Sequence, residues 1–167
     1  NSNPYTPAVN LVFALDEALK MMRQEGLDNI FMRHNKHKLA MSNAVKALNL
    51  KLFADEKCLS PSITAIKTEG MDAEEFRKTI KNKFDILLAG GQDHLKGKIF
   101  RVGHLGYVSD RDVITVISAI SKALFDLGEI TAQQAGEALV IATKYLEIGC
   151  VKYPALQHSH LIQQSFF

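Results

Sequence analysis

The sequence has few of the features that mark secreted, membrane or metal-binding proteins. Its two cysteines, Cys58 and Cys150, are too few for a disulfide framework, and we interpret both as reduced thiols of a cytoplasmic protein. No apolar run is long enough to span a membrane, and the N-terminus lacks the basic and apolar regions of a secretory signal. The formal net charge of +2 is small, so neither nucleic acid nor a membrane surface is an expected partner.

The composition is that of a folded domain. Hydrophobic residues make up 47% of the 167 residues and charged residues 23%, which is enough apolar material for one core. The chain begins with Asn1 rather than methionine. We therefore expect it to be a portion of a longer polypeptide.

Helical patterns dominate the first 48 residues. Thr6 and Pro7 suit the N-cap and the first position of a helix, apolar residues recur at helical spacing from Val9 to Met22, and Gly26 predicts the helix end. A second helix is expected at 28–48. Its expected apolar side consists of Ile30, Phe31, Leu39, Val45 and Leu48. Its other side, which we interpret as solvated, is basic and consists of Arg33, Lys36, Lys38 and Lys46.

The remaining pattern combines short strands with helices. Runs of β-forming residues predict strands at 51–54, 62–68, 85–91 and 98–104. Capping boxes that begin at Asp72, Ser109 and Thr131 predict helices that end near residues 84, 128 and 147. The segment 148–167 has no clear period and is expected to be an irregular tail. Residues 1–147 are therefore expected to form one α+β domain, with a small, mostly antiparallel sheet covered by helices on one face.

Arg101 is the first candidate for chemistry, because it stands inside the short apolar run Ile99–Val102. A guanidinium group binds a carboxylate through two parallel hydrogen bonds, so Arg101 fits a ligand clamp. It also fits a structural salt bridge or an exposed position on the wet face of a strand. The glycines at 90, 91 and 97 allow an anion cradle or a plain turn, and they match no nucleotide-binding motif.

Other reactive side chains form no recognisable site. His34 and His37 lie three residues apart on the second helix, and His158 and His160 lie in the tail, but no third ligand is near in sequence. No metal site is therefore expected. Neither cysteine stands in a nucleophile motif.

Five collinear stretches resemble a known enzyme family. They are TPAVNLVFALDEAL (6–19), GLDNIFMRHNKHKLAMSNAVKALNLKLF (26–53), SPSITAIKT (60–68), FDILLAGGQDHLKGKIFRVGHLGYVS (84–109) and VISAISKALFDLG (116–128). Together they resemble the C-terminal small domain of the class V, fold type I aminotransferases. The similar branch is the alanine–glyoxylate and serine–glyoxylate group, in which some proteins are named soluble hydrogenase small subunit.

The resemblance implies a homodimeric enzyme that uses pyridoxal 5'-phosphate to move an amino group from alanine or serine to a 2-oxo acid such as glyoxylate. It places the arginine that binds the substrate α-carboxylate at Arg101, and a residue that reaches the cofactor phosphate of the neighbouring subunit at Thr6. The cofactor lysine of the family belongs to a large N-terminal domain that this chain lacks, and Lys122 matches the C-terminal helix instead. No catalytic residue is therefore expected here, and the isolated chain is expected to be inactive.

Two other functions stay open. A stand-alone domain could bind a small carboxylate, or pair with a partner subunit, without any chemistry. A nucleic-acid module would use the basic side between Arg33 and Lys46, but that side lacks interleaved aromatic residues.

Overall fold

The structure is a computed structural model that describes residues 5–147 of the chain. The described chain divides into two units, one containing residues 5–30 and the other residues 31–147. The linker helix expected at the start of the domain 1–147 falls in the first unit. The tail expected at 148–167 lies outside the described residues.

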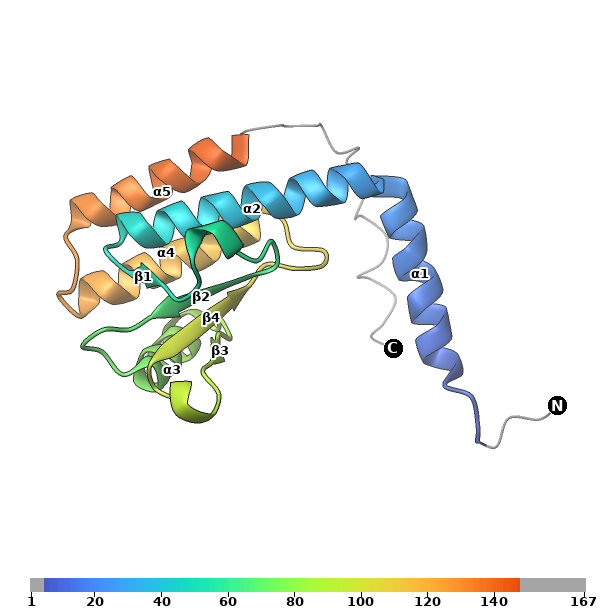
Figure 1. Ribbon diagram of the computed structural model, residues 1–167, viewed down its shortest axis with the longest axis horizontal. Coiled ribbons are helices and arrows are strands. Elements are labelled where there is room, and N and C mark those ends of the chain that lie inside the picture. Colours follow the sequence, from blue (N-terminus) through green and yellow to red (C-terminus); the bar gives the residue numbers. More distant parts are fainter. Residues whose placement is uncertain (1–4, 148–167) are drawn as a thin grey trace, which may run out of the picture. The chain divides into compact units, whose positions relative to one another are not determined.

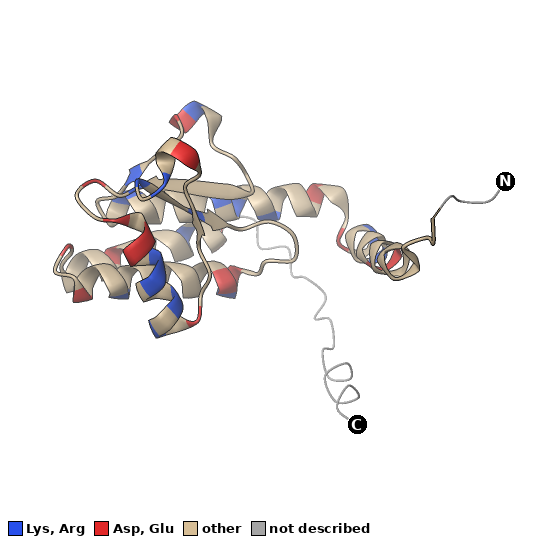
Figure 2. Ribbon diagram, turned by 90° about the horizontal axis from the view of Figure 1, so that it is seen from below, with Lys and Arg blue, Asp and Glu red and all other residues tan. Residues whose placement is uncertain are grey.

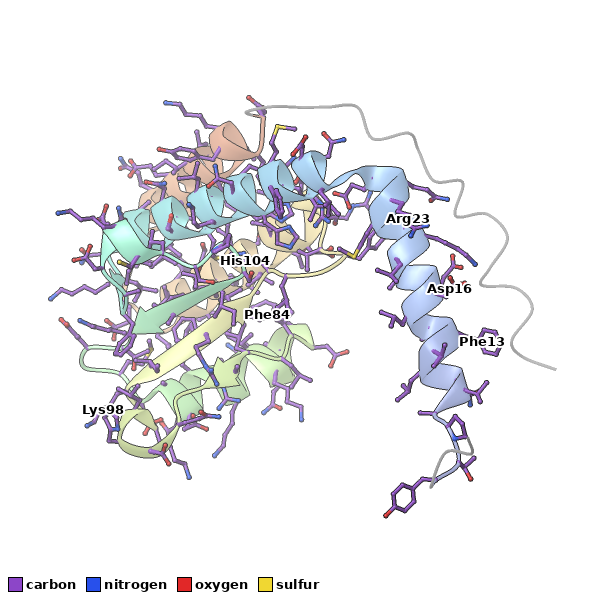
Figure 3. The ribbon with its side chains drawn as sticks, turned by 45° about the vertical axis from the view of Figure 1, so that its right-hand side comes forward. Phe13, Asp16, Arg23, Phe84, Lys98 and His104 are labelled. Atoms are coloured by element: carbon purple, nitrogen blue, oxygen red, sulfur yellow. The ribbon has the colours of Figure 1, made fainter. Side chains whose placement is uncertain are left out.

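The first unit holds helix α1, which spans Val9–Glu25 and is followed by Gly26 at a φ of 84°. The prediction of the helix end is confirmed, but the prediction of its start is wrong. Val9 N donates to Pro7 O at 2.9 Å, so Pro7 belongs to a turn before the helix, and Ala8 rather than Thr6 is the N-cap. No residue of α1 is buried, and Figure 3 labels Phe13 on this helix, with a side chain that is 69% exposed.

Helix α2 spans Leu27–Ala47 and packs its second half into the core of the second unit. Its core residues are Ala40, Met41, Ala44 and Val45. The sequence prediction for its two sides is partly wrong. Phe31, expected on the apolar side, is 65% exposed, whereas Arg33 and Lys36, expected in solvent, are each only 7% exposed. The reason is a set of polar partners from distant segments, described below.

The sheet of the second unit has four antiparallel strands in the order β1-β2-β4-β3. The strands are β1 (Lys51–Leu52), β2 (Ile63–Lys67), β3 (Ala89–Gly90) and β4 (Ile99–Gly103). The two edge strands are therefore shorter than the sequence predicts. In the register, Ile66 stands opposite Phe100, and Arg101 stands opposite both Ala65 and Ala89.

Helices α3 (Ala73–Phe84), α4 (Asp110–Asp126) and α5 (Ala132–Glu147) begin where the capping residues predict. The Asp72 side chain accepts from the backbone N–H groups of Glu74 and Glu75, and Ser109 and Asp112 form a complete capping box. Two short 3₁₀ turns, at Glu56–Cys58 and Asp93–Leu95, were not predicted.

One face of the sheet carries the core. Buried positions alternate along β2 and, from Phe100 onward, along β4, and Ile66, Phe100 and Val102 join one cluster with residues of α2, α3 and α4. The Phe76 and Phe100 rings pack with their centroids 5.2 Å apart. In Figure 1, α2 runs above the strands and α3 lies at their lower end, near β3. The predicted α+β class is therefore confirmed.

Candidate functional site

Arg101 lies on the sheet face opposite the core. Its neighbours in β4, Phe100 and Val102, point into the core, so the pleat sends the Arg101 side chain to the open face, where it is half-buried. Its Nε donates to the Gly90 carbonyl at 3.0 Å. Because the cross-strand neighbours Ala65 and Ala89 are small, they leave space beside the guanidinium group.

The distal part of the Arg101 guanidinium group is not taken up by an acid of the described chain. The ion pairs found among residues 5–147 do not include Arg101. Of the interpretations that the sequence left open, the structural salt bridge therefore finds no support within residues 5–147. An open-face guanidinium that is held through Nε keeps its Nη donors for a ligand and is suited to binding a carboxylate.

The glycines near Arg101 serve the fold. Gly91 N donates to Ile99 O at 3.1 Å, and Gly97 O accepts from Ala73 N at 3.0 Å, so both groups are used in backbone pairing. A Cβ at Gly91 would lie 2.1 Å from Leu95 O, which no side chain could tolerate. Backbone pairing and close packing account for Gly91, whose N–H group is therefore not available to an anion.

Thr6 lies in the first unit, just before α1, and is exposed. Within residues 5–147 no hydrogen bond to its hydroxyl is found. A hydroxyl of this kind can donate to a phosphate oxygen, which is the role that the family resemblance implies for Thr6.

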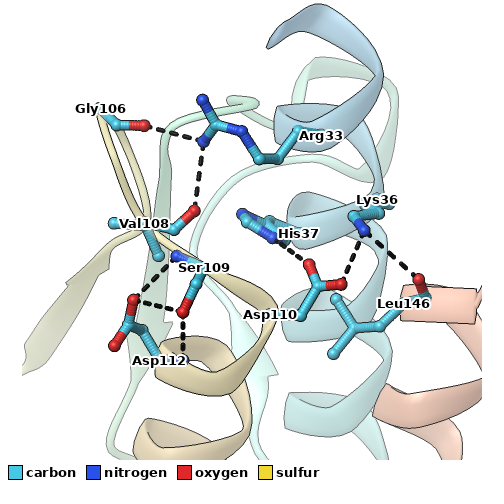
Figure 4. A network of polar contacts seen from close by, with 9 residues as sticks. All are labelled: Arg33, Lys36, His37, Gly106, Val108, Ser109, Asp110, Asp112 and Leu146. Atoms are coloured by element: carbon cyan, nitrogen blue, oxygen red, sulfur yellow. Dashed lines mark hydrogen bonds and ion pairs between the residues drawn. The ribbon is translucent and has the colours of Figure 1, made fainter. Parts of the chain in front are cut away.

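A buried polar network joins α2 to the start of α4 (Figure 4). Lys36 Nζ and His37 Nε2 both contact the Asp110 carboxylate at 2.7 Å, and Arg33 Nη1 donates to Gly106 O at 2.8 Å and to Val108 O at 3.2 Å. Burial opposes ionisation of Asp110, but the hydrogen bonds from His37 and Lys36 outweigh it and lower its pKa. The basic residues of α2 therefore hold the loop that follows β4, the strand in which Arg101 lies.

Two buried histidines belong to this part of the fold. His37 donates through Nε2 to Asp110, because an ionised carboxylate can only accept, and His104 Nε2 lies 2.9 Å from Thr64 Oγ1. Figure 3 marks His104 just beyond β4. Burial, followed by repulsion from His37, lowers the pKa of His104 to about 4, so this imidazole is neutral at pH 7. Among residues 5–147 no group of side chains is arranged to hold a metal ion.

The remaining candidates lie on the surface. Lys122 is exposed on α4, where it pairs with Asp126 one turn away. Figure 2 shows acidic and basic segments interleaved over the helices in that view, and the burial of Arg33 and Lys36 removes half of the basic side that a nucleic-acid module would need. Within the described chain, every helix is too short or too polar to cross a membrane.

The positioning partners of Arg101 were not anticipated. Gly90 supplies its carbonyl to Arg101 from another strand, and Arg77 of α3 supports the same edge strand by donating from Nε to Leu88 O at 2.7 Å. Sequence spacing cannot find contacts between elements, although the Glu74–Arg77 spacing does predict a pair on α3.

Comparison with known proteins gives a consistent picture. A scan against protein-family models finds no match. The chain is 56% identical over 128 residues to the soluble hydrogenase 42 kDa subunit of Anabaena cylindrica, an alignment that covers 77% of this chain and 33% of that protein. It is 32% identical to the (S)-ureidoglycine–glyoxylate transaminase of Bacillus subtilis, over 87% of this chain and 35% of that enzyme. It is 34% identical to the serine–glyoxylate aminotransferase of Methylorubrum extorquens, over 86% of this chain and 36% of that enzyme.

Solved structures agree. The ureidoglycine–glyoxylate aminotransferase of Bacillus subtilis superposes with a TM-score of 0.77 at 31% identity, covering 84% of this chain and 37% of that one. The pyridoxamine–pyruvate aminotransferase of Mesorhizobium loti superposes with a TM-score of 0.81 at 27% identity, covering 87% and 38%. The chain thus spans about a third of the length of the relatives it matches.

The fold, an antiparallel sheet with helices on one face and an arginine on the other, is shared with the matched part of these aminotransferase structures. The chain belongs to the class V aminotransferases and matches about a third of the length of these relatives.

Proposed function

We propose that the chain is the C-terminal portion of a cytoplasmic, homodimeric aminotransferase that uses pyridoxal 5'-phosphate. In this proposal it moves an amino group from alanine or serine to a 2-oxo acid such as glyoxylate. The glyoxylate-dependent relatives support the acceptor, since enzymes from separate organisms carry that substrate in their names. The observation that carries the proposal is Arg101, whose guanidinium group stands on the open sheet face without an acidic partner among residues 5–147.

Arg101 binds the substrate α-carboxylate in this mechanism. Both the amino acid and the oxo acid bring a carboxylate, so one rigid guanidinium serves both half-reactions. The bond from Nε to Gly90 O, at 3.0 Å, orients the planar group before the substrate arrives. That orientation lowers the entropic cost of positioning the substrate for reaction.

The described residues fit only the periphery of a pyridoxal phosphate site. The exposed hydroxyl of Thr6 is a suitable donor to the cofactor phosphate of a neighbouring subunit, whereas Lys122 is bound to Asp126 on a helix surface. When bound, the cofactor supplies the electron sink for amino-group transfer. In this proposal its lysine comes from another part of the enzyme, so the isolated chain is inactive.

Replacement of Arg101 in the complete enzyme tests this function. Arg101→Ala should raise the KM for the amino acid by about 30- to 150-fold, the equivalent of one charge-assisted bidentate contact of about 2–3 kcal/mol. Arg111→Ala, at an exposed arginine on α4 of the same unit, is the matched control and should leave the KM unchanged. A KM that is equally unchanged in Arg101→Ala would remove Arg101 from the substrate site.

A further inference from the structure

The edge strand that holds Arg101 is itself held by a second arginine. Arg77 of α3 donates from Nε to Leu88 O at 2.7 Å, and Arg101 of β4 donates from Nε to Gly90 O at 3.0 Å. In an extended chain, carbonyls two residues apart point to the same side. Two carbonyls of one short strand segment are therefore each capped by an arginine Nε, one from the helix side and one from the open face.

Gly90 is the point at which these two contacts meet. A Cβ at Gly90 would lie 2.5 Å from Arg77 Nη1 and 2.6 Å from Glu74 Oε1, so the Arg77–Glu74 ion pair rests directly against the Gly90 backbone. The ion pair itself has a length of 2.7 Å between Arg77 Nη1 and Glu74 Oε2. Both side chains are largely covered, at 27% and 31% exposure, which holds them in one geometry.

Strand β3 needs this support because it has only two residues and lies at the sheet edge. Its pairing with β4 alone gives few ladder bonds to hold the Gly90 carbonyl in place. Helix α3 is rigidly attached to the core through Phe76 and Ile80, the residues on either side of Arg77 on its buried face. A fixed helix thus carries a fixed arginine to the carbonyl segment that orients Arg101.

We infer that Arg77, held by Glu74, is a positioning residue for Arg101, and that it sets the direction of the guanidinium group that binds substrate carboxylates. This inference rests on the proposed function of Arg101. Arg77 itself does not contact the substrate. It acts through the backbone from Leu88 to Gly90.

Two variants perturb this support in different ways. Arg77→Lys keeps the positive charge but loses the Nε donation to Leu88 O, and Gly90→Ala keeps every charge but puts a methyl group where the Arg77–Glu74 pair rests. Arg111→Lys applies the same substitution to an exposed arginine of the same unit. In the complete enzyme, Arg77→Lys and Gly90→Ala should each raise the KM for the amino acid about fivefold, the equivalent of one net hydrogen bond, with kcat changed less than about twofold. Arg111→Lys should change neither.

A second readout does not depend on activity. In NMR spectra of the 167-residue chain, the Nε–H group of Arg101 should exchange slowly with water. Arg77→Lys and Gly90→Ala should each make this exchange faster. The control Arg111→Lys should leave the melting temperature of the chain unchanged. If Arg101→Ala raises the KM but Arg77→Lys and Gly90→Ala leave the KM and the exchange unchanged, the positioning role is overturned and the proposed function stands. If Arg101→Ala also leaves the KM unchanged, the proposed function itself fails. A fall in kcat at constant KM would likewise overturn the positioning role.

Discussion

Neutralising Asp110 should reveal how strongly the buried network holds α2 to the rest of the second unit. Asp110→Asn keeps the shape of the side chain but removes the charge that Lys36 and His37 both contact at 2.7 Å. The three residues come from α2 and from the first turn of α4, which are 73 and 74 residues apart in sequence. The substitution therefore tests a tertiary contact rather than a local one.

The magnitude follows from the burial of the partners. Removing one member of a fully buried ion pair costs about 3–5 kcal/mol, because the other charge stays in a medium of low polarity. The Lys36 side chain is only 8% exposed, but that of Asp110 is 39% exposed, so solvent offsets part of the loss. We expect the free energy of unfolding to fall by about 2–3 kcal/mol.

Urea unfolding of the 167-residue chain at pH 7 measures this change. Asp126→Asn is the matched control, since Asp126 pairs with the exposed Lys83 and Lys122, and it should have far less effect. In the double variant Lys36→Met, Asp110→Asn the Lys36 ammonium group is no longer left buried without its carboxylate, so part of the stability should return. The reasoning is refuted if Asp110→Asn is no more destabilising than the control, or if the effects of the two substitutions simply add.

Two further predictions concern stability. Burial lowers the pKa of His104 to about 4, well below its value near 6.5 in the unfolded chain. Between pH 6.5 and pH 4 the unfolded chain therefore binds a proton that the folded chain does not. Acidification from pH 7 to pH 5 should lower the free energy of unfolding by about 2 kcal/mol through this residue. His104→Gln should flatten that part of the pH profile of unfolding, and a profile that keeps its slope contradicts the assignment. Gly91→Ala should prevent folding or sharply lower the melting temperature measured by circular dichroism, because its Cβ would meet Leu95 O at 2.1 Å. Gly136→Ala, in a helix with nothing within 4 Å of the new Cβ, should be neutral or stabilise by up to about 1 kcal/mol, and equal effects of the two glycine variants would refute the close-packing argument.

Local signals predicted the element order well. The caps at Asp72 and Ser109 and the stop at Gly26 work through backbone groups within a few residues, so the sequence alone carries them. The start of α1 was misplaced because the turn at Pro7 also satisfies the preference of Thr-Pro for the beginning of a helix. The short edge strands were overestimated because strand length depends on available pairing partners as well as on β-forming residues.

In the candidate site, too, the sequence predicts some features, whereas contacts between separate elements appear only in the tertiary structure. Motifs in the sequence singled out Arg101 and Thr6, and the alternation of β4 predicts that Arg101 and the core residues lie on opposite faces. Neither motif nor period could predict that Gly90 O receives the Arg101 Nε, or that Arg77 supports that strand, because these contacts join separate elements.

By itself, then, the sequence determined the family, the α+β class and the positions of most helices, since these depend on local periodicity and on residues in collinear motifs. Only the tertiary structure decided that the basic side of α2 is buried at Arg33 and Lys36. The reason is physical: a cation leaves water only where acceptors offset its desolvation, and here they come from Gly106, Val108 and Asp110, more than 70 residues further along the chain.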